Sequence, residues 1–215
     1  MFRLLLAVLL CSIQINAFAE NKTAIFAGGC FWCMEKPYDK IDGVLSTMPG
    51  YTGGDLKNPT YKKISSGRTG HYEALLVEYD EDKVTYEKLL EVFWKNIDPF
   101  DARGQFCDKG TQYRSAIFTN DKTEIALATK SKNALQEKLK NKATIVTEIL
   151  PAKQFYSAEE YHQDYYIKNP VRYKYYRHGC GRDKRLKKVQ EILHGKSEND
   201  TASTIKSIWL KIING

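Results

Sequence analysis

The chain has 215 residues, of which 42% are hydrophobic and 27% are charged. This composition excludes a disordered or low-complexity protein and suits one globular domain with extensions. The formal charge of +7 concentrates between Lys168 and Lys188, where basic residues are mixed with tyrosines. A solvated basic surface with tyrosines packed against a core explains this pattern better than nucleic-acid binding, which we do not expect.

The first nineteen residues differ from the rest of the chain. Arg3 precedes an apolar run over residues 4–13, and Ala17 and Ala19 are small residues at the positions that define a cleavage site. This pattern is typical of a secretory signal peptide over residues 1–19, because the run is too short for a comfortable membrane span. We therefore expect export from a bacterial cytoplasm to the periplasm or the exterior.

The mature chain alternates predicted strands and helices. Alternating apolar residues and β-branching predict strands over residues 23–27, 44–51, 72–79, 115–118 and 144–150. Helices are predicted over residues 30–40, 85–96 and 122–141. A capping box of Ser157 and Glu160 predicts a further helix toward Lys168, which Pro170 ends. The hairpin-like spacing of the second and third strands favours a mixed or antiparallel sheet, so we predict an α+β two-layer sandwich, a ferredoxin-like plait with extensions.

The last twenty residues form a unit of their own. The main domain is predicted over residues 20–195, and residues 196–215 begin with a polar linker. The apolar residues that follow lie on one face of a helix: Ile205, Ile208, Trp209, Ile212 and Ile213. We expect this amphipathic helix to dock on the domain, and the alternative is contact with a membrane or a partner protein.

Four cysteines remain once Cys11 is removed with the signal peptide. Cys30 opens a predicted helix after a Gly-Gly turn, where unpaired amides and the helix dipole stabilise a thiolate. The glycines leave the sulfur accessible, and Cys33 lies one helical turn later, within reach of a disulfide. The pattern predicts a redox dithiol. A static disulfide is disfavoured because the loop is short, and a metal site because the ligand spacing is wrong.

Several further motifs accompany this dithiol along the chain. They are Gly29-Cys30-Phe31-Trp32, Gly50-Tyr51-Thr52-Gly53-Gly54, Pro59-Thr60-Tyr61, Gly70-His71-Tyr72-Glu73, Asp108-Lys109-Gly110-Thr111-Gln112-Tyr113-Arg114-Ser115 and Ala158-Glu159-Glu160-Tyr161-His162-Gln163. In these motifs and their order, from about residue 22 to about residue 190, the sequence resembles the A-type peptide-methionine sulfoxide reductases.

The resemblance implies a reaction and a set of site residues. The reaction is reduction of methionine S-sulfoxide, protein-bound and free, which repairs exported proteins after oxidative stress. Cys30 is implied as the attacking thiolate and Glu73 as a general acid that burial keeps protonated. Tyr61 and Tyr113 are implied as hydroxyl donors to the sulfoxide oxygen, and Asp108 as a carboxylate that orients water. Phe31 and Trp32 are implied as an aromatic wall for the substrate methyl group.

Attack on the sulfoxide leaves a sulfenic acid on Cys30, with which a second thiol condenses. Cys33 stands where many family members carry glycine, while Cys180 resembles the usual C-terminal resolving cysteine, so both are candidates. Cys107 is expected to stay reduced within the wall of the site.

The resemblance implies no cofactor and no metal. It implies an external dithiol reductant such as thioredoxin, oxidised proteins as substrates and a monomeric enzyme. The alternative function is a general C-x-x-C thiol–disulfide oxidoreductase, and a third is a non-enzymatic binding module. Turnover of methionine sulfoxide distinguishes the first from both.

Overall fold

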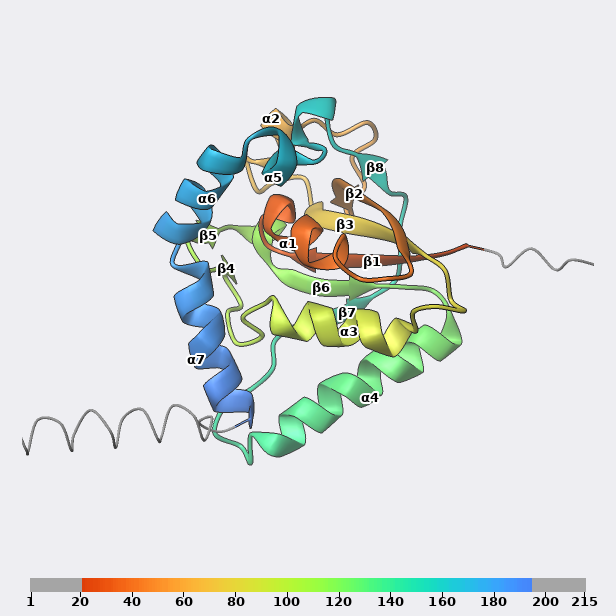
Figure 1. Ribbon diagram of the computed structural model, residues 1–215, viewed down its shortest axis with the longest axis vertical. Coiled ribbons are helices and arrows are strands. Elements are labelled where there is room, and N and C mark those ends of the chain that lie inside the picture. The colour runs from red at the N-terminus through yellow and green to blue at the C-terminus, as the bar shows by residue number, and fades with distance from the viewer. Residues whose placement is uncertain (1–20, 195–215) are drawn as a thin grey trace, which may run out of the picture.

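The computed structural model describes residues 21–194, and a six-stranded sheet forms its central layer (Figure 1). The strand order is β7-β6-β1-β3-β2-β8, and all neighbours are antiparallel except β6 and β7. The strands are β1 Lys22–Gly28, β2 Val44–Thr52, β3 Tyr72–Tyr79, β6 Ser115–Phe118, β7 Glu148–Leu150 and β8 Tyr156–Ser157. A separate hairpin consists of β4 Gly104–Gln105 and β5 Asp108–Lys109.

Helices α1 and α3 lie in front of the sheet in Figure 1, and α4 to α7 surround these layers. The helices are α1 Phe31–Tyr38, α2 Tyr61–Ile64, α3 Tyr86–Lys95, α4 Lys122–Lys138, α5 Tyr165–Lys168, α6 Pro170–Gly179 and α7 Arg182–His194. The four strands β6-β1-β3-β2, with α1 after β1 and α3 after β3, form the predicted ferredoxin-like plait. The predicted α+β fold is confirmed.

The main core lies between the sheet and these two helices. Phe26 of β1 stacks against Tyr38 of α1 and Phe93 of α3, with ring centroids 5.4 Å apart in both pairs. All three side chains are fully buried, and burial of such rings is the dominant favourable term in folding. This packing fixes α1 on the sheet, so the residues at its first turn are held rigidly.

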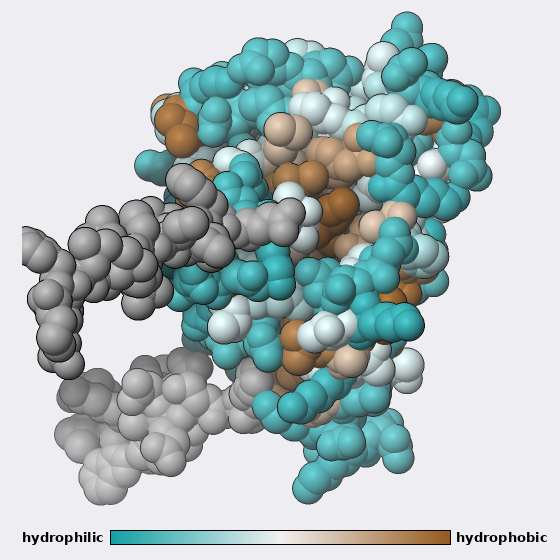
Figure 2. Space-filling model, turned by 90° about the vertical axis from the view of Figure 1, so that its right-hand side faces the viewer, coloured by the Kyte–Doolittle hydropathy of each residue, from teal (hydrophilic) through white to brown (hydrophobic). Residues whose placement is uncertain are grey.

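The side of the molecule at the right of Figure 1 has a mostly hydrophilic surface. Figure 2 shows hydrophobic residues gathered in a hollow at the centre of this side, with hydrophilic residues around them. Among residues 21–194, no helix has both the length and the apolar character needed to cross a bilayer.

The helix predicted from Ser157 to Lys168 is wrong. The Ser157 hydroxyl donates to the Ala158 carbonyl instead of capping a helix, and the segment contains β8, a 3₁₀ turn and the short α5. Asp164 adopts a left-handed conformation with φ of 54°, and its amide donates to the Glu35 carboxylate at 2.8 Å. This tertiary contact outweighs the local capping signal. The short α5 does end at Lys168, before Pro170, as expected, and Pro170 then begins α6, because proline suits the first helical turn.

The other predicted elements are present, and the strands over residues 72–79 and 115–118 have the predicted ends, whereas the ends of the rest are shifted. The strand predicted over residues 144–150 is limited to β7, and the helix predicted over residues 122–141 ends at Lys138. The expected signal peptide and the expected C-terminal amphipathic helix lie outside the described residues.

Candidate active site

The site begins where β1 passes into α1. Gly29 has φ of +77°, and a Cβ at this position would lie 2.5 Å from the Cβ of Gln105, so the turn requires glycine. Cys30 follows as the N-terminal cap of α1, and the amide of Cys33 donates to its carbonyl at 3.0 Å. The two side chains are only 5% and 1% exposed. The sulfur of Cys30 is therefore buried, whereas we expected it to be accessible.

The two thiols titrate as a pair. Burial, and then hydrogen bonding with Cys33, raises the pKa of Cys30 well above its ordinary value. Hydrogen bonding with Cys30, followed by the charges of Arg182 and Arg177, lowers the pKa of Cys33 to about 6. Burial thus outweighs the helix dipole that we expected to lower the pKa of Cys30. At neutral pH the pair holds one negative charge, shared across the hydrogen bond between the sulfurs.

A small cavity of about 70 Å³ opens in front of Cys30. Its lining consists of Cys30, Phe31, Trp32, Tyr61, Glu73, Asp108, Tyr113 and Tyr176. Every residue that we predicted for catalysis and substrate binding, apart from the two resolving candidates, thus lies around one space.

Glu73 reaches this cavity from β3. One of its carboxylate oxygens accepts a hydrogen bond from the Phe31 amide at 3.2 Å. Burial raises the pKa of Glu73 to about 8, so the side chain is mostly protonated at neutral pH. Burial also raises the pKa values of the Tyr61 and Tyr113 hydroxyls, which interact with each other by a hydrogen bond. The cavity therefore presents three protonated oxygen groups.

The aromatic part of the lining is fixed by α5 and the turn before it. The Trp32 indole stacks on Tyr165 with ring centroids 3.7 Å apart and an angle of 7° between the planes. Its Nε1 donates to Nδ1 of His162 at 3.1 Å. Burial lowers the pKa of His162 to about 4, so the imidazole is neutral and can accept this bond.

Tyr176 is a lining residue that the sequence analysis missed. Its hydroxyl donates to Asp108 at 2.5 Å, and its ring meets the edge of Trp32 with centroids 5.9 Å apart. The tyrosine-rich stretch contains no pattern that separates Tyr176 from its neighbour Tyr175, which is 82% exposed. Only the packing of α6 against the cavity distinguishes them.

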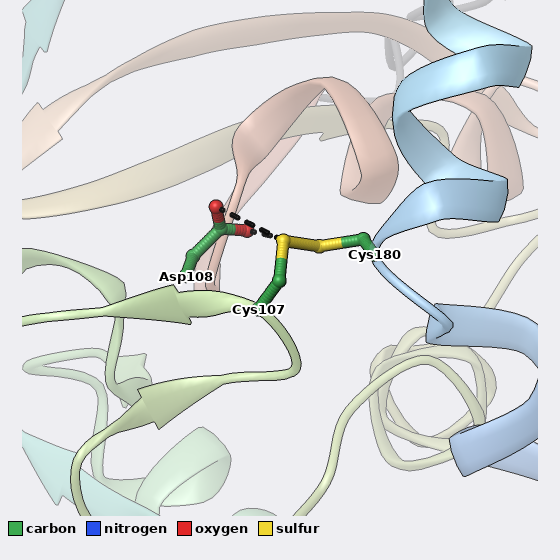
Figure 3. A group of neighbouring side chains, drawn as sticks. All are labelled: Cys107, Asp108 and Cys180. Atoms are coloured by element: carbon green, nitrogen blue, oxygen red, sulfur yellow. Dashed lines mark hydrogen bonds between the residues drawn. A yellow bond between two sulfur atoms is a disulfide. The ribbon is translucent and has the colours of Figure 1, made fainter.

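Cys107 and Cys180 form a disulfide at the rim of the site (Figure 3). Cys107 lies in the turn between β4 and β5 and is exposed, and Cys180 lies at the junction of α6 and α7. The Asp108 carboxylate oxygens lie 3.7 Å and 3.9 Å from the two sulfurs. The prediction that Cys107 stays reduced and packs in the site wall is wrong, because its hairpin turn points toward α6 and not into the cavity.

Among the described residues, Cys107, Asp108 and Cys180 are the group whose possible ligand atoms lie close enough together to hold a metal ion. Because the two sulfurs are bonded to each other, neither can act as a thiolate ligand. The cavity in front of Cys30 has one thiol, hydroxyls and carboxyl groups, which can attack an electrophile and transfer protons without a metal ion.

Comparison with known proteins decides which family uses this arrangement. The family model of the peptide methionine sulfoxide reductases matches residues 22–193. The chain belongs to this family. Peptide methionine sulfoxide reductase MsrA 2 of Caulobacter vibrioides is 49% identical over 189 residues, which covers 88% of this chain and 95% of that protein. The MsrA of Bacillus subtilis is 51% identical over 163 residues, which covers 76% and 92%.

Solved structures agree with this assignment. Mxr1 of Saccharomyces cerevisiae in reduced form matches with a TM-score of 0.66 and 37% identity, over 71% of this chain and 88% of that one. Methionine sulfoxide reductase A of Corynebacterium diphtheriae matches with a TM-score of 0.63 and 35% identity, over 70% and 76%. The predicted family and enzyme class are confirmed, and the chain is a reductase of methionine sulfoxide in peptides.

Arg182 is a second feature of this reductase that the sequence analysis missed. Its side chain is 1% exposed, and one guanidinium nitrogen donates to the carbonyls of Gly28 and Asn96 at 3.1 Å and 2.7 Å. The guanidinium also lies over the Phe106 ring at 4.3 Å. Arg182 therefore joins α7 to the end of β1, directly behind the catalytic turn.

We expect Arg182→Met to lower the free energy of unfolding by roughly 2–4 kcal/mol, because two buried carbonyls lose their donor. Urea unfolding followed by circular dichroism measures this change. Lys184→Met is the control, since Lys184 lies on the same helix and is exposed, and it should change stability by less than about 0.5 kcal/mol. Equal stability of both variants would show that Arg182 does not hold α7 in place.

Proposed function

We propose that this reductase acts on the S epimer of methionine sulfoxide, with Cys30 as the nucleophile and Glu73 as the proton donor. The observation that supports this proposal is the composition of the Cys30 cavity. A thiol, a protonated carboxyl group, two hydroxyls and aromatic rings line one small space. Reduction of a sulfoxide needs each of these groups, because the sulfur must be attacked while its oxygen is protonated.

The Cys30 sulfur attacks the sulfoxide sulfur, and the proton of its thiol passes to Cys33, with which it shares a hydrogen bond. Glu73 donates a proton to the sulfoxide oxygen, and Tyr61 and Tyr113 donate hydrogen bonds to it. The oxygen is transferred to Cys30, so methionine leaves and a sulfenic acid remains. One sulfoxide is reduced, and one thiol is oxidised.

The two walls of the cavity support selection of one epimer. Phe31 and Trp32 offer an apolar surface for the substrate methyl group, and the protonated oxygen groups line the same cavity. Because the stacking of Trp32 on Tyr165 fixes the apolar surface and β3 fixes Glu73, methyl and oxygen cannot exchange places without losing hydrogen bonds.

Cys33 is the thiol that resolves the sulfenic acid in this proposal. It lies one turn from Cys30 on the same helix, while Cys180 is bonded to Cys107. Condensation releases water and joins Cys30 to Cys33. A dithiol protein of the thioredoxin type then restores both thiols by exchange, and no bound cofactor takes part.

A double variant, Cys33→Ser with Cys180→Ser, should stop at the Cys30 sulfenic acid after one turnover. With no external dithiol present, a sulfenic-acid trap and mass spectrometry should find the label on Cys30. Cys180→Ser alone is the control and should yield the Cys30–Cys33 disulfide without trapped label. A disulfide between Cys30 and Cys107 in the double variant would contradict the assignment of Cys33.

The cellular role in this proposal is repair of exported proteins in the periplasm or outside the cell. The support is the signal-peptide pattern of residues 1–19. We further propose that the enzyme is a monomer and that the amphipathic segment within residues 196–215 docks on the domain. The alternative of a general thiol–disulfide oxidoreductase is disfavoured, because such an enzyme has no use for Glu73 and Tyr113, which line the cavity in front of Cys30.

Turnover of the separated epimers tests the proposed function. The purified mature enzyme with dithiothreitol should convert methionine S-sulfoxide to methionine and leave the R epimer unchanged. Equal conversion of both epimers would contradict the proposed geometry of the cavity. Insulin reduction without conversion of either epimer would favour the oxidoreductase alternative.

A further inference from the structure

We propose that residues 205–213 of this chain bind, through their apolar face, in a groove between α3, α4 and α7. Docking of this segment on the domain is part of the proposed function, and the groove is the surface that it occupies. The assignment rests on that part alone and not on the chemistry at Cys30. Once the segment is in place, α7 is held at both ends, by Arg182 where the helix begins and by the groove where it ends.

The groove has a volume of about 440 Å³ and lies where the three helices converge. The buried part of its lining consists of Leu90 and Trp94 of α3, Leu135 of α4 and Leu193 of α7. Helix α4 contacts both α3 and α7, and the C-terminal ends of α4 and α7 meet at the bottom of Figure 1. A cavity of about 150 Å³ already holds a benzene ring, so this groove has room for several apolar side chains of an incoming segment.

The position of the groove relative to the end of α7 favours residues 205–213 as its occupant. Leu193, the penultimate residue that the structure describes, is itself part of the lining. Ten residues separate His194 from Ile205, and an extended chain of that length spans up to about 35 Å. Gly195 follows α7 directly, and a glycine at this place is typical of a chain that turns away from its helix axis. The linker is therefore long enough for the segment to fold back, and its attachment gives the segment a high effective concentration at the groove.

The sequence of the segment has the pattern that an apolar groove requires. Its large apolar residues recur at the spacing of one helix face: Ile205, Ile208, Trp209, Ile212 and Ile213. A contiguous apolar face of this kind is rarely left in water on a monomeric protein. Contact with the leucines and the tryptophan of the groove removes apolar area from water on both sides, which favours docking.

The charges around the groove are compatible with a basic occupant. Its rim carries Glu87, Glu91, Lys95 and Lys138, of which Glu91 and Lys95 pair with each other at 3.9 Å. Glu87 is exposed and forms no ion pair among residues 21–194. Residues 202–215 include two lysines and no acidic side chain. A lysine of the segment can therefore pair with Glu87 while the apolar face fills the groove.

A photo-crosslinking amino acid in place of Trp209 tests the contact directly. With benzoylphenylalanine at this position, irradiation of the purified enzyme should join residue 209 to α3, α4 or α7 of the same molecule, and peptide mapping locates the product. The same probe in place of Ser207, which lies off the apolar face, is the control and should yield at least tenfold less of this product. The assignment would be overturned by equal yields from the two positions, or by products only with another part of the domain, with a second molecule or with the lipid of anionic vesicles.

A charged substitution in the full chain gives a second measurement. Ile208→Asp places a carboxylate on the apolar face and should lower the thermal unfolding midpoint by roughly 2–4 °C, because the groove loses its cover. Ser207→Asp is the matched control and should shift the midpoint by less than about 1 °C. Equal midpoints in the two variants would contradict docking in the groove.

Both variants should form methionine with dithiothreitol at the rate of the unchanged enzyme, since the groove shares no lining residue with the Cys30 cavity. Failure of the proposed chemistry has a different sign, because the unchanged enzyme would then form no methionine. The crosslink and the unfolding midpoints do not depend on that result.

Discussion

Replacement of Cys30 by serine should abolish the formation of methionine from its sulfoxide. The serine hydroxyl fits the same cavity but remains protonated at neutral pH and is a far weaker nucleophile than a thiolate. The loss should fall below the detection limit with dithiothreitol and with thioredoxin alike. Methionine released in a single turnover, quantified by liquid chromatography, measures the effect.

Cys33→Ser is the matched control for this change, because it replaces the other buried thiol on the same helix. It should still release one equivalent of methionine, more slowly than the unchanged enzyme, since a serine accepts the Cys30 proton poorly. Appreciable turnover by Cys30→Ser would mean that another cysteine attacks the sulfoxide. The unfolding midpoints of both variants show whether the fold is retained.

The nucleophile turn could be predicted because its signals are local. Two glycines before Cys30 and a C-x-x-C spacing specify a tight turn followed by a helix, whatever the rest of the chain does. The four central strands could be predicted for a similar reason, since their apolar and β-branched residues form short runs that can be recognised within the sequence. These elements hold Cys30 and Glu73, the two groups that do most of the proposed chemistry.

The segment after residue 150 could not be predicted, because long-range contacts decide its structure. A buried carboxylate on α1, Glu35, binds the amide of Asp164 and breaks the helix that the capping box indicated. The position of Tyr165 on Trp32 follows from that break. No pattern within residues 157–168 carries information about a partner 129 positions away.

The shift in the pKa of Cys30 was predicted in the wrong direction for a similar reason. The helix N-terminus is visible in the sequence, but the burial of Cys30 depends on Tyr165 and Tyr173, which pack around the pair from α5 and α6. Desolvation by these rings opposes the dipole and exceeds it. The pairing of Cys107 with Cys180 likewise depends on where α6 ends, which the sequence analysis did not anticipate.

Glu73→Gln should lower kcat for methionine sulfoxide by about 10²–10⁴-fold while the fold is retained. The amide has the shape of the protonated carboxyl group and can still accept the hydrogen bond of Phe31, but it cannot release a proton to the sulfoxide oxygen. The pKa of Glu73 is raised to about 8, so the acid form is present below that pH and is lost above it. The rate of the unchanged enzyme should therefore fall about tenfold per pH unit above about pH 8.

Glu35→Gln provides the matched control, because Glu35 is equally buried and its pKa is also raised to about 8 by burial, yet it does not line the cavity. It should keep the activity of the unchanged enzyme within a few fold and keep the decline above pH 8. Glu73→Gln should lose that decline together with its rate, because the group whose deprotonation causes it is gone. A pH–rate profile between pH 6 and pH 10 measures all three enzymes. If Glu73→Gln were fully active near pH 7, or if Glu35→Gln alone lost the decline, the proton would have to come from another group.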